Sequence, residues 1–304
     1  MAGILCYNDF MEYAQTKDLD VVYFVKDTYT NEELVYSLRS LERNFSYRRL
    51  FIYGGLPQGI KPDVYRRFNY KLDTKWDRVR AMYRDACLDD ELSDDFVLFN
   101  DDFFVMRKTE KLAPMYRCTM DEHISLLKQR YAGMASSYAK VLEKAQNMLK
   151  MANKGYSEVL SYELHIPMIF NKHKLLEVMG AFPEAHALRT IYGNYFQIGG
   201  KQADDVNVFS PRQKFSKFTQ FLSSDDIVWH ERNDFNDYIR NKFDKPSRYE
   251  ENIVTLGKNE VRIKPIVNYY DRELMRKVSP LDEAWVTSID RANMLFEKGL
   301  VRVL

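Results

Sequence analysis

One run of this 304-residue chain governs the architecture that its sequence predicts: Phe96-Val97-Leu98-Phe99-Asn100-Asp101-Asp102-Phe103-Phe104. Its apolar half is typical of a strand that is buried on both faces, as strands of parallel sheets are. Carboxylates at the tip of such a strand are costly to desolvate unless a cation or a ligand compensates their charge. Ligands of parallel α/β sheets bind beyond the carboxyl ends of the strands, so Asp101 and Asp102 are predicted where a divalent metal would hold a phosphate. The alternative interpretation is an acidic turn that caps a following helix.

The residues before this run alternate between strand patterns and helix patterns. Strand-like apolar runs and amphipathic helical runs follow one another along the chain, with strands predicted at 20–25, 49–53 and 64–68 and helices at 30–44 and 75–88. This alternation is the signature of a parallel α/β sheet flanked by helices. The sequence therefore predicts an α/β fold in which the turn at 100–102 closes the first unit.

A helical insertion is expected after the acidic turn, over about residues 119–155. Its apolar side chains step by four and three residues from 127 to 148, which is a heptad stripe. The members of the stripe are Leu127, Tyr131, Met134, Tyr138, Val141, Ala145 and Met148. The stripe fits a coiled-coil contact that makes a homo-oligomer, or a helix or helical hairpin lying over its own domain; we favour the second. An insertion here is well placed as a lid or as an acceptor-binding arm.

A second, small unit is predicted at residues 251–304, after a main domain over residues 1–250. The segment 246–250 breaks the preceding pattern, and a new pattern begins with a strand at 261–267. A helix that starts at 288 or 290 and ends at 298, and a final strand at 301–304, complete an α+β module. About 44 residues make a marginal core, so this module is expected to dock on the main domain or on a partner.

Composition narrows the class of protein. Apolar residues make up 45% of the chain and charged residues 29%, which is an ordinary globular balance. A net charge of +1 provides no global field for nonspecific nucleic-acid binding. The three cysteines form no C-x-x-C pair, so the chain is expected in a reducing cytoplasm. No apolar run is long enough to span a membrane.

Further polar residues fall at predicted strand and helix ends. Asp27 follows the first strand and could contact a nucleotide, or it could cap the next helix. Lys75 and Arg78 open a helix whose N-terminal amides attract anions, so they could hold a pyrophosphate; surface salt bridges would explain them as well.

Four more acidic or imidazole groups are candidates for the chemistry itself. His165 lies in a strand-like run over 161–170, where it is either a core histidine or a group that touches substrate. Asp225 and Asp226, with His230, could complete a metal shell or act as a base for an acceptor hydroxyl. The chain lacks the P-loop, dinucleotide-binding and serine-hydrolase motifs, so those classes are not indicated.

The segments 20–25, 31–41 and 99–104 together resemble the Stealth family of sugar-phosphate transferases and, more broadly, glycosyltransferases of the A type. His165 with Pro167, and the segment 221–226, are similar to later blocks of that family. The resemblance implies a GT-A-like domain that uses a nucleotide-sugar donor with Mn²⁺ or Mg²⁺. In such a domain Asp101 and Asp102 are expected to bind the metal, and His230 could complete the metal shell.

The segments 192–196 and 245–250 are similar to glycosyltransferase-like proteins of tailed bacteriophages, and 289–301 resembles modules on phage structural proteins. Three functions are therefore expected in order of preference. The first is metal-dependent glycosyl transfer to a glycan, a protein or modified DNA. The second is Stealth-type transfer of sugar 1-phosphate. The third is a non-enzymatic role as a virion-associated or scaffolding protein.

Overall fold

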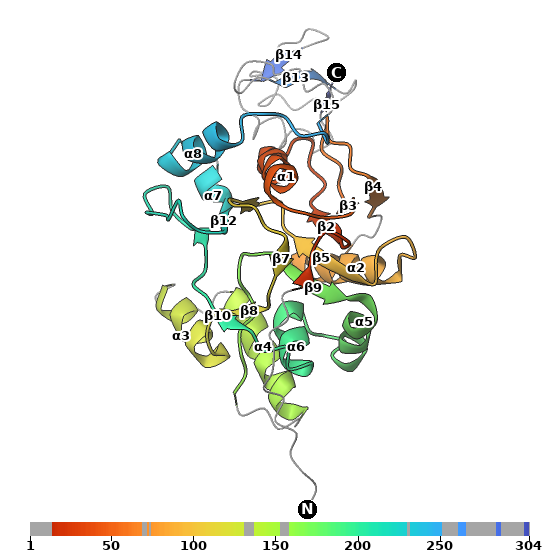
Figure 1. Ribbon diagram of the computed structural model, residues 1–304, viewed down its shortest axis with the longest axis vertical. Coiled ribbons are helices and arrows are strands. Elements are labelled where there is room, and N and C mark those ends of the chain that lie inside the picture. The colour runs from red at the N-terminus through yellow and green to blue at the C-terminus, as the bar shows by residue number, and fades with distance from the viewer. Residues whose placement is uncertain are drawn as a thin grey trace, which may run out of the picture.

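The computed structural model describes residues 14–68, 72, 74–130, 137–152, 158–229 and 232–250, and the strands at 261–265, 284–286 and 301–303. Its centre is a five-stranded sheet (Figure 1). The strands lie in the order β4 (Val64–Arg67), β3 (Leu50–Gly54), β2 (Asp20–Val25), β5 (Asp95–Phe99) and β9 (Met168–Asn171). The first four are parallel, and β9 is antiparallel to β5. This confirms the α/β class and the mostly parallel sheet.

Alternate residues of β2 face two different cores. Val21, Tyr23 and Val25 pack with the buried leucines of helix α1 (Glu32–Asn44). Val22 packs instead with a core that α2 (Lys75–Leu88), α5 (Lys172–Ala181) and α6 (Leu188–Tyr195) help to build. Figure 1 shows α1 above the strands and α5 and α6 below them. The sheet is therefore covered by helices on both faces, as its continuous apolar strands require.

The predicted helical insertion is two helices, α3 (Met120–Arg130) and α4 (Ser137–Met151), which contact each other. Leu127 and Ala145 of the heptad stripe are buried in the core that α2, α5 and α6 share, and the side chains of Tyr138, Val141 and Met148 pack against it. Tyr131 and Met134 lie outside the described residues. The stripe thus packs on its own domain, as the favoured interpretation predicted, and an oligomer built through it stays a prediction.

A second, three-stranded sheet carries the chain away from the acidic turn. It consists of β11 (Asn207–Val208), β12 (Phe221–Ser224) and β6 (Phe103–Val105), with β12 in the middle. The outer edge of β6 is covered by polar side chains of α1. Ser40 Oγ accepts the N–H of Val105, and Asn44 Nδ2 donates to the Val105 carbonyl at 2.7 Å. A buried strand edge is thereby satisfied by a helix rather than by another strand.

The segment that ends at Glu250 packs against α1. Arg39 donates from Nε and Nη2 to the two carboxylate oxygens of Glu250 at 2.8 and 2.7 Å, and from Nη1 to the Phe243 carbonyl at 3.1 Å. Both partners are buried, with 14% of the Arg39 side chain and 5% of the Glu250 side chain exposed. The paired geometry satisfies two charges that would be costly to bury singly.

The remaining elements are short. They are β1 (Ala14–Gln15), β7 (Lys111–Leu112), β8 (Met115–Tyr116), β10 (Lys201–Gln202), α7 (Asp226–Trp229) and α8 (Asp234–Lys242). Within the described ranges no helix combines the length and the apolar character that crossing a membrane requires.

The C-terminal strands β13 (Val261–Pro265), β14 (Ala284–Val286) and β15 (Val301–Val303) form an antiparallel sheet with β13 in the middle. The predicted strands at 261–267 and 301–304 are confirmed. The helix predicted to end at 298 lies outside the described residues, and the division of the chain at residue 250 stays a prediction.

Candidate functional site

The acidic turn, residues Asn100 to Asp102, lies between the two sheets. It follows the carboxyl end of β5 and precedes the first residue of β6, whose N–H donates to the Asn100 carbonyl at 3.2 Å. Because β2, β3, β4 and β5 are parallel, the turn lies at the edge where all four strands end. This is the edge at which open parallel sheets bind their ligands.

Asn31 fixes the first acid of the turn. Its Oδ1 accepts the Leu34 N–H at 2.9 Å and so caps the N-terminus of α1, while its Nδ2 donates to Asp101 Oδ2 at 2.6 Å. One side chain therefore ties the helix start to the turn. The partial positive charge of the helix N-terminus also favours a carboxylate at this place.

Residues at the end of β12 fix the second acid. Ser223 is opposite Phe103 in the strand register, and its Oγ donates to Asp102 Oδ2 at 2.6 Å. The next residue, Ser224, donates to Glu33 Oε1 of α1 at 3.1 Å. The acidic turn is thus held between α1 and β12, which are far apart in the sequence.

Asp225 follows β12 directly and is exposed. Its N–H donates to the Val208 carbonyl, and its own carbonyl accepts the N–H groups of Val228 and Trp229 in α7. The structure thus brings the end of β12 to the acidic turn, and the acceptor-side role of Asp225 stays a prediction. The side chain of Asp226 and the whole of His230 lie outside the described residues, so their predicted roles stay predictions.

His165 is not in a strand, because β9 begins only at Met168. It lies in the irregular segment before β9, where its Nδ1 is 2.9 Å from Asp205 Oδ1. The imidazole also meets the ring of Phe103, with centroids 6.4 Å apart, so it lies beside the start of β6. The prediction of a strand over 161–170 was wrong for this part, although His165 does lie near the acidic turn.

The charges around His165 raise its pKa by more than burial lowers it. Burial lowers the pKa of His165, but the hydrogen bond and charge of Asp205, together with the charge of Asp102, raise it above its ordinary value. Burial alone would raise the pKa of Asp205, yet His165 and Arg117 lower it below its usual range. Arg117 Nη1 donates to Asp205 Oδ2 at 2.9 Å. The His165–Asp205 pair therefore favours an imidazolium beside a carboxylate.

Arg189 holds the segment around His165 in place. Its Nη1 donates to the carbonyls of Leu164 and Ile166, each at 2.8 Å, and its guanidinium lies 5.7 Å from the centroid of the Phe103 ring. Its Nη2 is buried and has no hydrogen-bond partner within the described part of the chain. A second guanidinium, besides that of Arg117, is thus fixed close to His165.

Of the residues predicted to bind the donor, the structure places Asp27 at the edge where the parallel strands end. Asp27 is exposed just past β2, and a Cβ on Gly55 would lie 2.4 Å from the Asp27 Cα, so the ends of β2 and β3 approach too closely there for a larger residue. Lys75 and Arg78 lie in the first turn of α2, as predicted. Their described contacts are local: Lys75 lies over the Trp76 ring, and Arg78 donates to the Leu72 carbonyl.

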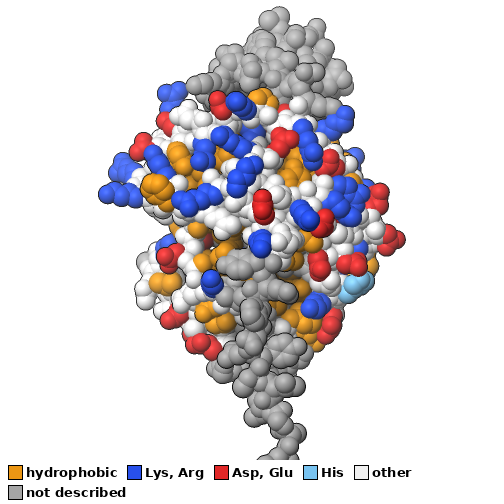
Figure 2. Space-filling model, in the orientation of Figure 1, with side chains coloured by type: hydrophobic (Ala, Val, Ile, Leu, Met, Phe, Trp, Pro, Cys, Tyr) orange, Lys and Arg blue, Asp and Glu red, His pale blue; other side chains and the backbone are white. Residues whose placement is uncertain are grey.

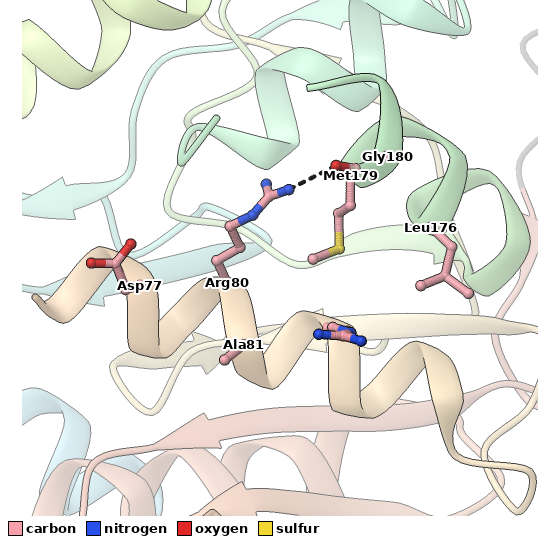
Figure 3. Close-up of a pocket in the computed structure, with 7 residues that line it drawn as sticks. Asp77, Arg80, Ala81, Leu176, Met179 and Gly180 are labelled. Atoms are coloured by element: carbon pink, nitrogen blue, oxygen red, sulfur yellow. Dashed lines mark hydrogen bonds between the residues drawn. The ribbon is translucent and has the colours of Figure 1, made fainter. Parts of the chain in front are cut away.

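A groove of about 420 Å³ lies elsewhere, between α2 and α5 (Figure 3). Arg80 crosses it and donates to the carbonyls of Met179 at 2.8 Å and Ala185 at 2.7 Å. Its lining residues are Asp77, Arg80, Ala81, Arg84, Leu176, Met179 and Gly180. None of these belongs to the acidic turn or to the His165–Asp205 pair, so this groove and the candidate site are different places.

The acidic turn suits a cation that is bound together with a phosphate. In the described part of the chain no group of three or more His, Cys, Asp or Glu side chains is placed to hold a metal ion. The turn offers two adjacent carboxylates, and Mg²⁺ sites commonly use one or two carboxylates plus the phosphate oxygens of the substrate. The donor chemistry therefore fits such a shared site rather than a closed metal cage.

Sequence reasoning did not identify three residues that organise this site. Asn31 was visible only as a helix start, although an asparagine before two glutamates is a capping signal. Ser223 was noted only within the segment 221–226, and Asp205 was not singled out. Each acts through a partner at least 40 residues away, for which the sequence carries no local signal.

Comparison with known proteins identifies no family. No family model matches the chain, and no curated protein matches it either. Among solved structures, the apo-form glycosyltransferase GlyE of Streptococcus pneumoniae TIGR4 is similar, with a TM-score of 0.29 and 14% identity. The match covers 62% of this chain and 46% of GlyE, so it spans less than half of that protein. So distant a likeness carries no information about chemistry, which rests on the residues of the site.

Proposed function

We propose that this chain is a GT-A-like glycosyltransferase that uses a nucleotide-sugar donor and Mn²⁺ or Mg²⁺. The observation that carries the proposal is the acidic turn: Asp101 and Asp102 leave the carboxyl end of β5 and are held there by Asn31 and Ser223. Asp101 and Asp102 would hold the cation. A divalent cation there supplies a positive charge that stabilises a diphosphate leaving group.

The chain's own groups have distinct roles in this proposal. Asp27 contacts the nucleotide, and Lys75 and Arg78 attract its phosphates through charge. On the acceptor side, the His165–Asp205 pair has the geometry of an imidazole oriented by a carboxylate. The neutral imidazole, which forms above the raised pKa of His165, can take the proton of an acceptor hydroxyl. Asp225 is an exposed carboxylate at the end of β12 that can share this task.

Transfer of sugar 1-phosphate, as the Stealth resemblance implies, is the second candidate. One observation favours it: the guanidinium groups of Arg117 and Arg189 lie beside His165, and planar guanidinium groups suit a phosphoryl group. The products separate the two reactions, because glycosyl transfer releases a nucleoside diphosphate and sugar-phosphate transfer releases a nucleoside monophosphate. The bacteriophage setting and a scaffolding role rest on the sequence alone.

Asp102→Asn tests the proposal. The amide oxygen can still accept the Ser223 hydroxyl, so the fold is retained while the charge needed by a cation is lost. Thermal unfolding is followed with UDP, GDP, CDP and dTDP sugars, each with and without Mn²⁺. Binding at a hundredfold excess over Kd adds about 2.7 kcal/mol, which corresponds to roughly 5–10 °C for a domain of this size.

The matched control is Asp90→Asn, an exposed carboxylate that precedes β5 and so lies at the opposite edge of the sheet. We expect a shift that needs both metal and one nucleotide, that is lost in Asp102→Asn and that persists in Asp90→Asn. Absence of any shift in the folded wild-type protein would refute a nucleotide-sugar enzyme and favour a scaffolding role.

A further inference from the structure

The loop at residues 209–220, between β11 and β12, carries an isolated basic patch. The stretch from 206 to 224 contains Arg212, Lys214 and Lys217 and no acidic residue. All three basic side chains are exposed. No described carboxylate forms an ion pair with any of them, whereas arginines elsewhere, such as Arg66 and Arg240, are paired. This positive charge is therefore available to a partner.

The same loop presents an aromatic side chain to solvent. Phe218 is 80% exposed, and it is the one phenylalanine among the exposed large apolar side chains of the described residues. Phe215, three residues earlier, instead packs against Phe235 and Tyr238, with ring centroids 5.2 and 5.5 Å apart. One phenylalanine thus anchors the loop while another is left at its surface, between basic residues.

Hydrogen bonds order the first residues of the loop. Gln213 accepts the Phe209 N–H at 2.8 Å and donates to the Asn207 carbonyl at 3.2 Å. Lys217 of the loop and Lys242 of α8 both lie over the Tyr238 ring, which adds a fourth cation to the patch. In Figure 1 the loop projects beside β12 and α7, and Figure 2 shows Lys and Arg side chains gathered on that side of the molecule.

We infer that this basic loop docks on the surface of an anionic phospholipid bilayer. A phenylalanine flanked by cations suits the boundary between headgroups and acyl chains: Phe218 enters it, while Lys214, Lys217 and their basic neighbours meet lipid phosphates. Single-stranded nucleic acid is a poorer fit, because successive bases need several free aromatic faces. Here the neighbouring rings of Phe209 and Phe215 already pack within the protein.

The loop also borders the candidate site. Its first residue, Phe209, meets the His165 ring at 6.2 Å between centroids, and its last residues lead through β12 to Ser223 beside Asp102. Docking through the loop therefore brings the lipid surface close to the acceptor side. We therefore expect the acceptor to be carried by the membrane. This expectation about the acceptor rests on the proposed function. The docking itself does not depend on that function.

Vesicle co-sedimentation without donor or metal tests the docking separately from catalysis. Vesicles of phosphatidylglycerol with phosphatidylcholine are compared with phosphatidylcholine alone, at low and at high salt. We expect binding only to the anionic vesicles and weakening by salt, because charges at a lipid surface are screened. Phe218→Ser should weaken binding about tenfold, and Lys214→Gln with Lys217→Gln about 25-fold.

Matched controls are Met151→Ser, at a methionine that is 84% exposed, and Lys111→Gln with Lys140→Gln, at exposed lysines on other elements. These should bind within about twofold of the wild type, since they lie outside the loop. The inference is overturned by equal binding to neutral vesicles, by no binding to anionic ones, or by loop variants that match the controls. Preferential binding of a short single-stranded oligonucleotide through the same side chains would overturn it in favour of nucleic acid.

Discussion

Replacing Asn31 with aspartate separates the two tasks of this residue. Aspartate caps a helix as well as asparagine does, so the bond from the Leu34 N–H to Oδ1 is retained. The donor that lies 2.6 Å from Asp101 Oδ2 is replaced by a charged acceptor. Asn31→Asp therefore keeps α1 capped but places two carboxylates against each other at the acidic turn.

The cost has two parts. A hydrogen bond to a charged group contributes about 1.5–3 kcal/mol, and that contribution is lost. Two unit charges about 4 Å apart also repel by about 1 kcal/mol in water and about 4 kcal/mol at an effective dielectric constant of 20. Asp101 is half-buried and the two side chains can rotate apart, so we expect the free energy of unfolding to fall by about 3 kcal/mol near neutral pH.

Urea unfolding with a chelator present measures this loss, and Asn171→Asp is the matched control. Asn171 caps α5 and donates to Asp95 Oδ1 at 2.8 Å, but that pair is exposed, so the same change should cost about 1 kcal/mol or less. Repulsion raises a carboxyl pKa in the folded Asn31→Asp protein, so the penalty is full above that pKa and shrinks as the pH falls. A loss no larger than that of Asn171→Asp would refute the reasoning.

Two other changes have defined outcomes. Ser40→Ala leaves the buried Val105 N–H without its acceptor and should lower the free energy of unfolding by about 2 kcal/mol. Ser125→Ala, at an exposed position of α3, should change it by under about 0.5 kcal/mol, and equal effects would contradict the role of Ser40. Asp205→Asn removes the carboxylate that raises the pKa of His165, so the imidazole, followed by NMR, should titrate at lower pH. Because folding raises the pKa of His165, the stabilisation by the pair is full below the unfolded pKa of about 6.5 and is lost as the pH rises through the higher folded pKa. The variant should lose that dependence, and an unchanged titration would count against the pairing.

The central sheet could be predicted because its strands are short apolar runs bounded by turn residues. Runs such as 20–25 and 49–53 are apolar after their first residue, so both faces of the strand must be buried, as they are in a parallel sheet. The run at 161–170 has the same character but pairs with β5 only from Met168 onward. Arg189 explains part of why the first residues of this run form no strand. Its side chain donates to the carbonyls of Leu164 and Ile166, which in a strand would accept hydrogen bonds from a neighbouring strand.

The candidate site was predictable only in part. The acidic turn is local, because its two carboxylates directly follow a strand, and its place at the sheet edge follows from the parallel topology. The groups that hold it are not local. Asn31 and Asp101 are 70 residues apart, and Asp102 and Ser223 are 121 residues apart. Such contacts depend on how the two sheets are packed, which no spacing in the sequence encodes.

Helix α1 completes its contacts late during synthesis. The hydrogen-bond partners of its Asn31 and Ser40 are synthesised 70 and 65 residues later. The partner of Arg39, Glu250, is synthesised 211 residues later. At about 5–20 residues per second, a ribosome needs roughly 10–40 s to deliver that last carboxylate. Until then the Arg39 guanidinium lacks the Glu250 carboxylate with which it is buried. A nascent chain that stops before Glu250 should therefore hold α1 loosely, and the packing of α1 is completed only when residue 250 has been synthesised.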